Sequence, residues 1–180
     1  MNLDDIHDLD FRLLCEQVVS AMDRFHVPGV AVGVIHDGKE HAAGFGVTNI
    51  DHPLSVDADT LFQIGSTTKT FTATAAMRLV EMGKLDLDAP IRNYLPNFRL
   101  KDKDVAASVT LRHLLTHMGG WLGDYFDDLS DGDDALAKYV AKMDELPQLT
   151  PLGAVWSYNN AGFSVAGRVI EVVMGKTYEA

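Results

Sequence analysis

The apolar residues near the N-terminus recur at helical spacing, which predicts an amphipathic helix over residues 4–26. We expect its buried stripe to consist of Ile6, Leu13, Leu14, Val18, Met22 and Phe25. Cys15 lies within the same helix, where we expect a small buried hydrophobic residue. The sequence Val27-Pro28-Gly29 then ends the helix, because proline and glycine both interrupt a helical backbone.

A strand-turn-strand pattern follows this helix. Residues 30–35 are almost all apolar, which predicts a strand, and Asp37-Gly38 is a strong signal for a tight hairpin turn. We expect the return strand over residues 40–47 and a loop over residues 49–60. Since a two-stranded sheet is only marginally stable by itself, this hairpin predicts a sheet with further strands.

The next periodic stretch runs from Phe71 to Val80 and predicts a second helix. Phe71, Ala75 and Leu79 lie on one line of that helix, and Gly83 is its candidate C-cap residue. Three further helices are expected over residues 111–116, 134–146 and 161–174. Their expected boundaries are Thr110 as an N-cap, Pro147 after the second and Gly175 after the third.

A long acidic loop is predicted between Gly119-Gly120 and Asp134. It contains Asp124, Asp127, Asp128, Asp131 and Asp133. Its simplest interpretation is a solvated surface, and the alternative is that it borders a cleft. Trp121 and Tyr125 could line such a cleft, although aromatic side chains are more often packed than ligand-binding.

Composition narrows the class of protein. With 180 residues, 47% hydrophobic and 23% charged, the chain is typical of one soluble globular domain with a sizeable core. A net charge of −11 argues against nucleic acid and against anionic membranes as partners. The single cysteine excludes an intrachain disulfide. No signal peptide and no membrane span is evident, so we expect a cytoplasmic location.

Candidate chemistry begins at Ser66 and Lys69, which lie three residues apart in the first turn of the second helix. A capping role for Ser66 leaves Lys69 unexplained. A capping box has Glu or Gln three residues after the cap, where this chain has Lys69, and the helix dipole disfavours a cation in the first turn. In a catalytic role, the dipole and burial would favour neutral Lys69, which could take the Ser66 hydroxyl proton. The Ser66 amide could then face an oxyanion. The spacing alone is a weak signal.

A second candidate pair, Tyr158 and Asn160, lies on a loop just ahead of the last predicted helix. By themselves these residues favour a structural interpretation, in which Tyr158 packs and Asn160 caps the helix. His113 and His117 lie four residues apart, which is the spacing of a zinc pair, but the catalytic Glu of zinc proteases is missing. We therefore expect core or capping histidines, no metal site and no cofactor.

Together, these segments resemble the class C β-lactamase and penicillin-binding-protein-like serine hydrolases. Residues 61–69 resemble the nucleophile segment of that family, and residues 114–120 resemble its Leu-Leu-Thr-His-Thr-Ser-Gly segment. Residues 151–162 resemble its Pro-Gly…Tyr-Ser-Asn-x-Gly segment, and residues 170–176 resemble the helix that follows. The order agrees from about residue 11 to residue 180.

The resemblance implies an α/β fold in which an antiparallel sheet is flanked by helices, with a mostly helical subdomain. It implies that Ser66 is the acyl-accepting nucleophile, that Lys69 and Tyr158 transfer protons, and that Asn160 binds the substrate amide or orients Lys69. The expected partner is a small-molecule ester, amide or β-lactam, as in esterases, β-lactamases and D-amino-acid peptidases. A cytoplasmic location favours the esterase, because cell-wall substrates lie outside the cytoplasm.

The family also carries a third motif, Lys-Thr-Gly or His-x-Gly, on a late strand that supplies the second oxyanion amide. His36-Asp37-Gly38 matches by letters but lies in the predicted hairpin turn, and Lys176-Thr177-Tyr178 lacks the glycine. His117-Met118-Gly119 belongs to another segment. We therefore interpret residues 1–180 as the N-terminal part of one domain, without its C-terminal strands. Since one oxyanion donor contributes roughly 2.7–4 kcal/mol, this chain alone is expected to be weak or inactive.

A non-catalytic alternative remains open from the sequence. The chain could be a fragment or interaction module that retains half of the fold. The unpaired edge of its sheet would then favour self-association.

Overall fold

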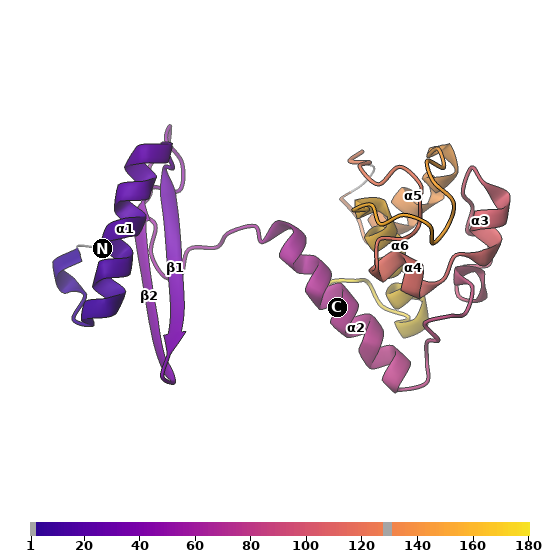
Figure 1. Cartoon of the computed structure of the whole chain (residues 1–180), viewed down its shortest axis with the longest axis horizontal. Coiled ribbons are helices and arrows are strands. Elements are labelled where there is room, and N and C mark those ends of the chain that lie inside the picture. Colours follow the sequence, from indigo (N-terminus) through magenta and orange to yellow (C-terminus); the bar gives the residue numbers. More distant parts are fainter. Residues whose placement is uncertain (1–2, 128–130) are drawn as a thin grey trace. The chain divides into compact units, whose positions relative to one another are not determined.

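The computed structural model describes residues 3–127 and 131–180, which fall into two compact units (Figure 1). The first unit ends at Gln63 and the second begins at Ile64. The first unit contains a 3-10 turn at Leu3–Asp5, helix α1 at Leu9–Phe25, and strands β1 at Gly29–His36 and β2 at Lys39–Gly46. Its helix and hairpin confirm the elements predicted for this part of the sequence.

Helix α1 is shorter than predicted because Asp8 caps it, accepting a hydrogen bond from the Phe11 amide at 2.9 Å. Phe11 and Cys15 face the hairpin, and Cys15 is fully buried as expected. The predicted stripe was partly wrong, since three of its members are exposed: Leu13, Leu14 and Phe25. Helical periodicity identifies an apolar face of α1, whereas contact with the hairpin determines which side chains of that face are buried.

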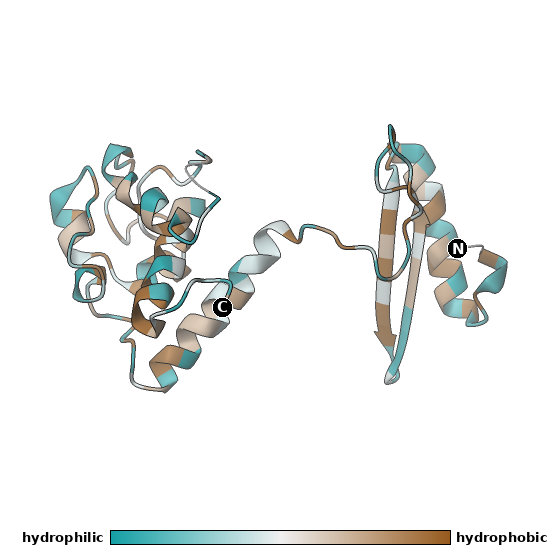
Figure 2. Cartoon of the chain, turned by 180° about the vertical axis from the view of Figure 1, so that it is seen from behind, coloured by the Kyte–Doolittle hydropathy of each residue, from teal (hydrophilic) through white to brown (hydrophobic). Residues whose placement is uncertain are grey.

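Strands β1 and β2 pair in antiparallel register, with Val32 opposite Ala43. Asp37 and Gly38 connect them and both have positive φ, as a type I′ hairpin turn requires, so this predicted turn is confirmed. Ala43 and Phe45 of β2 join the residues of α1 in a small core. Figure 2 shows β1 as mostly apolar along its length.

The second unit is helical. Its helices are α2 at Thr68–Glu81, α3 at Lys103–Ser108, α4 at Leu111–Leu115, α5 at Ala135–Ala141 and α6 at Asn160–Met174. Short 3-10 turns occupy Gly65–Thr67, Ile91–Asn93 and Met143–Glu145. The predicted helix over residues 134–146 is therefore α5 followed by a 3-10 turn. Helix α3, capped by Asp102, was not predicted.

Helix α6 forms the centre of this unit and packs against α2, α4 and α5. Its ribbon is largely brown in Figure 2, in keeping with its many buried apolar residues. Trp121 is only 2% exposed and belongs to the same core, so it packs rather than lining a cleft. In α2 the buried residues are Thr72, Ala76 and Leu79, whereas Phe71, on the same predicted apolar line as Leu79, is exposed.

The acidic segment after Gly120 carries exposed Asp124, Asp127, Asp131 and Asp133, while Asp128 lies outside the described residues. Among the helices of residues 3–127 and 131–180, none is both long and apolar enough to cross a bilayer. The expected cytoplasmic location stays a prediction.

Candidate active site

The backbone around Gly65 brings Ser66 to the start of α2. Gly65 has a φ of +52°, in the left-handed region that favours glycine, and the 3-10 turn Gly65–Thr67 leads directly into the helix. The Ser66 hydroxyl does not cap the helix and lies 3.2 Å from Nζ of Lys69. The capping interpretation of Ser66 is therefore wrong, and the serine is paired with the lysine that this interpretation left unexplained.

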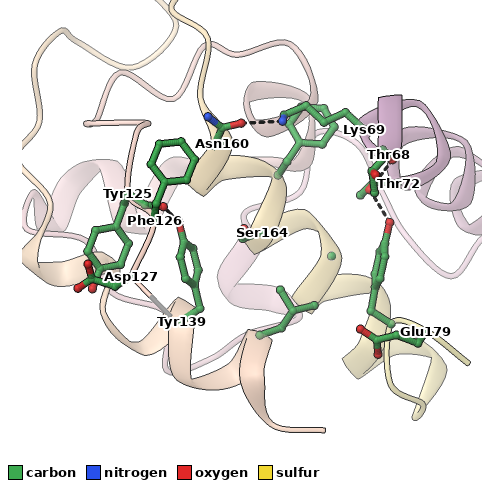
Figure 3. Close-up of a pocket in the computed structure, with 14 residues that line it drawn as sticks. Thr68, Lys69, Thr72, Tyr125, Phe126, Asp127, Tyr139, Asn160, Ser164 and Glu179 are labelled. Atoms are coloured by element: carbon green, nitrogen blue, oxygen red, sulfur yellow. Dashed lines mark hydrogen bonds between the residues drawn. The ribbon is translucent and has the colours of Figure 1, made fainter. Parts of the chain in front are cut away.

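Lys69 joins this pair to the start of α6. Its Nζ donates a hydrogen bond to Oδ1 of Asn160 at 2.7 Å, as Figure 3 shows. The same Nζ lies 4.8 Å from the centroid of the Tyr158 ring and 5.6 Å from that of Phe163. The ammonium group is thus held between an amide oxygen and two aromatic rings, which fixes its position beside Ser66.

The amide of Asn160 can adopt only one orientation here. Its Nδ2 donates to Oδ1 of Asp124 at 2.9 Å, while its Oδ1 accepts from Lys69. Since an ammonium group only donates and a carboxylate only accepts, these two neighbours assign the amide oxygen and nitrogen without ambiguity. Of the two roles left open for Asn160, this geometry shows contact with Lys69.

The helix cap expected of Asn160 is instead supplied by its neighbour. The Asn159 side chain accepts from the Gly162 amide at 2.6 Å and donates to the Trp121 carbonyl at 3.0 Å. Asn159 is only 3% exposed, so both hydrogen bonds are buried. Because Asn159 caps α6, the Asn160 side chain is free to face Lys69.

Tyr158 presents its hydroxyl to the same group of residues. Hydrogen bonding to Lys69, and then to Ser66, lowers the pKa of Tyr158 from its ordinary value. The side chain is 40% exposed, and its ring stacks on that of His117 with 4.5 Å between centroids. Lys69 is therefore the cation that favours the phenolate form of Tyr158.

The His117 ring stacks on the Tyr158 ring and so supports the site, a role that the sequence analysis did not predict. Its backbone is left-handed, with a φ of +59°, and its Nδ1 accepts from the Asn159 amide at 3.0 Å. Burial, and then the charge of Lys69, lower the pKa of His117, which favours the neutral ring. Its place in the 114–120 segment was the available signal for a role in the site.

His113 has a capping role, as expected. Its side chain and that of Thr110 form a reciprocal capping box at the start of α4, with 2.8 Å between Thr110 Oγ1 and His113 Nδ1. Because α4 ends at Leu115, the two histidines do not share a helical face. In the part of the chain that the structure describes, no three His, Cys, Asp or Glu residues are grouped to hold a metal.

A cavity of about 400 Å³ lies beside Lys69 and Asn160 (Figure 3). Figure 3 places Tyr125 and Tyr139 on one side of it and Thr72 and Glu179 on the other. Tyr125 therefore lines a cavity, which was the alternative considered for it. Ser66 and Tyr158 are not part of the cavity wall, so the cavity meets the site at Lys69 and Asn160.

The structure thus brings together Ser66, Lys69, Tyr158 and Asn160, the residues that the sequence analysis singled out. It also adds Asp124 and His117 to them. His36-Asp37-Gly38 lies in the β1–β2 turn, as predicted, and belongs to the other unit.

Comparison with protein families gives a match over most of the chain. Residues 16–180 match a family model described as Beta-lactamase. This range begins within α1 and contains Ser66, Lys69, Tyr158 and Asn160.

Two curated relatives illustrate the range of similar proteins. Penicillin-binding protein 4 of Amycolatopsis lactamdurans is 39% identical over 154 residues, which cover 86% of this chain and 40% of the relative. Esterase EstB of Burkholderia gladioli is 34% identical over 172 residues, which cover 88% of this chain and 44% of the relative. The chain therefore spans less than half the length of these two proteins.

A solved structure has a similar fold. The octameric penicillin-binding protein homologue from Pyrococcus abyssi superposes with a TM-score of 0.79 at 33% identity, covering 95% of this chain and 41% of that one. This similarity confirms the predicted α/β fold class.

Proposed function

Because this chain belongs to the beta-lactamase family, we propose that it carries the nucleophile of a serine hydrolase that forms an acyl-enzyme on Ser66. One observation carries the proposal. Lys69 Nζ is held by Asn160 Oδ1 at 2.7 Å while it lies 3.2 Å from the Ser66 hydroxyl oxygen. A serine hydroxyl is a weak nucleophile unless a neighbouring group takes its proton. Lys69 places a cation beside the hydroxyl, and Tyr158 is hydrogen-bonded to both Lys69 and Ser66.

Tyr158 is the proposed base, with Lys69 as the cation that stabilises its phenolate. This assignment agrees with the direction of the Tyr158 pKa, which Lys69 and Ser66 lower by hydrogen bonding. In the first step the phenolate takes the Ser66 proton and Oγ bonds to the substrate carbonyl carbon. The bond from that carbon to the leaving oxygen or nitrogen then breaks, and the leaving group takes the proton from Tyr158.

In the second step water attacks the acyl-enzyme. Tyr158 accepts a proton from the water, the bond between the carbonyl carbon and Ser66 Oγ breaks, and Oγ takes the proton. The products are a carboxylic acid and free Ser66. The position of Ser66 at the start of α2 favours the negative oxygen of each intermediate, because the N-terminal end of a helix is electropositive.

The proposed substrate is a small-molecule ester or amide, with a simple ester preferred. The Burkholderia relative is named an esterase and the Amycolatopsis relative a penicillin-binding protein, so both esters and β-lactams lie within the proposed class. D-Amino-acid peptides enter it only through the family resemblance of the sequence. No motif for the second oxyanion donor was found in residues 1–180. We therefore propose that this chain is part of one larger hydrolase domain and that its own turnover is weak.

The test is stoichiometric labelling, which does not require turnover. The purified chain and its Ser66→Ala variant are incubated with a fluorophosphonate, and intact masses are measured. The expected result is one adduct on the wild type and none on the variant. A wild-type chain without an adduct, although folded by circular dichroism, would overturn the proposal.

The non-catalytic alternative has one observation in its favour. Strands β1 and β2 form a sheet of two strands, and Ile35 of β1 is exposed within its own unit. An exposed apolar side chain on so small a sheet favours association between chains. Size-exclusion chromatography with light scattering would detect a concentration-dependent dimer, and a monomer at all concentrations would remove this alternative.

A further inference from the structure

Side-chain hydrogen bonds connect α2 to α6 and the segment after it, in the first turn of α2 and again in the next. The first is the contact between Lys69 Nζ and Asn160 Oδ1 described above. In the second, the hydroxyl oxygens of Thr72 and Tyr178 are 2.6 Å apart. Lys69 and Thr72 are neighbours on one helix and both line the cavity beside the site (Figure 3). The Thr72–Tyr178 contact therefore lies next to the lysine of the proposed hydrolase.

The segment after α6 is folded back onto the helix by a buried carboxylate. Glu171 is 5% exposed, its Oε1 accepts from the Tyr178 amide at 3.0 Å, and its Oε2 accepts from Arg168 Nη1 at 2.8 Å. Gly175, with a φ of +64°, turns the chain at the end of the helix. A Cβ on Gly167 would lie 3.4 Å from Cδ2 of Tyr178, so the tyrosine ring lies against this face of α6. Tyr178 is therefore held at both its backbone and its ring.

The direction of the hydrogen bond between Thr72 and Tyr178 follows from the protons available. The Thr72 hydroxyl donates its one proton to the Thr68 carbonyl at 3.2 Å, so it accepts from Tyr178. Replacing Tyr178 with phenylalanine removes this hydrogen bond and leaves the Thr72 proton satisfied. The effect of this substitution on the site can consequently be separated from a general loss of folding.

Thr72 is the first buried residue of α2. It is 5% exposed, whereas residues 68–71, which precede it in the helix, are exposed or half-buried within this unit. The packing of the nucleophile-bearing end of the helix therefore begins at Thr72. Because Lys69 reaches across to Asn160 on the other helix, a displacement of this end of α2 changes that contact directly.

We propose that Tyr178 is a positioning residue of the proposed active site. Its hydroxyl holds the first turns of α2 against α6 through Thr72, and so keeps Lys69 in contact with Asn160. Glu171 contributes by fixing the backbone of Tyr178. This inference rests on the proposed function, because the arrangement that Tyr178 maintains is that of the proposed nucleophile and its lysine.

The first test is a double-mutant cycle on the rate of fluorophosphonate labelling. Tyr178→Phe and Thr72→Val remove the same contact, so each should slow the labelling of Ser66 about three- to tenfold. The double variant should be no slower than the slower single variant. Thr72→Ser keeps the hydroxyl and should recover labelling to within about twofold of the wild-type rate. Multiplied effects in the double variant, or wild-type labelling of Tyr178→Phe, would overturn the proposal.

The second test follows Tyr158 by NMR and does not depend on the reactivity of Ser66. Tyrosine labelled with ¹³C at Cζ reports the ionisation of each hydroxyl, and Tyr158→Phe assigns the Tyr158 signal. Since Lys69 lowers the pKa of Tyr158 by hydrogen bonding, loss of the Tyr178 hydroxyl should move that pKa upward. The groups around Tyr158 are unaltered in Tyr178→Phe: Lys69, Ser66, Asp124 and His117. An unchanged Tyr158 pKa would overturn the proposal.

Tyr94→Phe is the matched control, because it makes the same change elsewhere in the helical unit. The Tyr94 hydroxyl accepts from the Asp86 amide at 2.7 Å, and Tyr94 is not part of the cavity wall beside Lys69. This variant should keep the wild-type labelling rate and the wild-type Tyr158 pKa, and circular dichroism verifies that each variant is folded. Equal slowing in Tyr94→Phe and Tyr178→Phe would show general destabilisation and reject the role of Tyr178.

The positioning role and the proposed function fail in distinguishable ways. If the wild type gives no fluorophosphonate adduct and the Tyr158 pKa rises in Tyr178→Phe, the hydrolase is rejected and the positioning role is retained. If Ser66 forms an adduct at the same rate in the wild type and in Tyr178→Phe, the hydrolase is retained and the role of Tyr178 is rejected.

Discussion

Nζ of Lys69 lies 2.7 Å from Oδ1 of Asn160, although 91 positions separate the two residues in the chain. Lys69 is in the first turn of α2 and Asn160 begins α6, and these two helices pack against each other. The contact therefore depends on a helix interface, with Asn159 capping α6 immediately before Asn160. Two adjacent asparagines consequently have separate tasks, which mutation can distinguish.

We predict that Asn159→Ala destabilises the fold and that Asn160→Ala acts mainly on the site. Asn159→Ala removes a helix cap and leaves the buried Trp121 carbonyl without its donor, which should cost about 2–4 kcal/mol. Asn160→Ala should cost less than about 1 kcal/mol and slow the labelling of Ser66 at least tenfold. Urea unfolding and fluorophosphonate labelling rates measure the two effects.

Asn159→Ser is the control for this pair, because its hydroxyl can still accept from the Gly162 amide as an N-cap residue while the donor to Trp121 is lost and no charge is buried. Asn159→Ser should be less destabilising than Asn159→Ala. Equal effects of Asn159→Ala and Asn160→Ala on both measurements would contradict the division of tasks.

The second prediction concerns pH and Tyr158. Because hydrogen bonds from Lys69 and Ser66 lower the pKa of Tyr158 below its ordinary value of 10.0, its phenolate forms at lower pH than usual. The rate of Ser66 labelling should therefore rise with pH and reach half its maximum below pH 10. In Lys69→Met the midpoint should move upward, and the rate at pH 7 should fall about tenfold for each pKa unit regained.

Labelling rates measured from pH 6 to 10 test this prediction. Tyr158→Phe is the control, since it removes the titrating hydroxyl and should flatten the profile as well as slow the reaction. An identical midpoint in wild type and Lys69→Met would show that Lys69 does not set the Tyr158 pKa.

The third prediction concerns the stability of the site at low pH. Burial lowers the pKa of His117, so between that pKa and the ordinary value of 6.5 the unfolded chain binds more protons than the folded chain. The stability associated with the neutral ring is fully present above pH 6.5 and is lost as the pH falls through the folded pKa. His117 should contribute a slope of at most about 1.4 kcal/mol per pH unit.

His117→Asn is the informative variant, because its amide oxygen can accept from the Asn159 amide but does not titrate in this range. Urea midpoints at pH 7.5 and 5.5 should differ less in the variant than in the wild type. A residual slope is expected from His113, whose pKa is also lowered by burial. The same pH dependence in both proteins would contradict the assignment to His117.

The fourth prediction concerns the hairpin. A Cβ on Gly44 of β2 would lie 2.4 Å from Cα of Asp57, so Gly44→Ala must displace the segment beside the strand. A Cβ on Gly33 of β1 meets no atom within 4 Å, so Gly33→Ala is the matched control. Hydrogen exchange followed by mass spectrometry should show at least about tenfold faster exchange over residues 29–46 in Gly44→Ala alone. Unchanged protection in that variant would refute the prediction.

The sequence determined the features that depend on a few neighbouring residues. Asp37-Gly38 specified the hairpin turn, because both residues tolerate the positive φ that the turn needs. Gly175 specified the end of α6 for a similar reason. Helical spacing also brings Ser66 and Lys69 within reach of each other, because they are three residues apart in the chain.

The tertiary structure alone decided which faces are buried and which distant side chains meet. Leu13, Leu14 and Phe71 fit an apolar pattern, yet they are exposed because their helices present other lines to their partners. The sequence could not assign the helix cap to Asn159 rather than Asn160, or bring Asp124 to the Asn160 amide. Periodicity constrains neighbours along one helix, whereas the distance between Lys69 and Asn160 is set by the packing of α2 on α6.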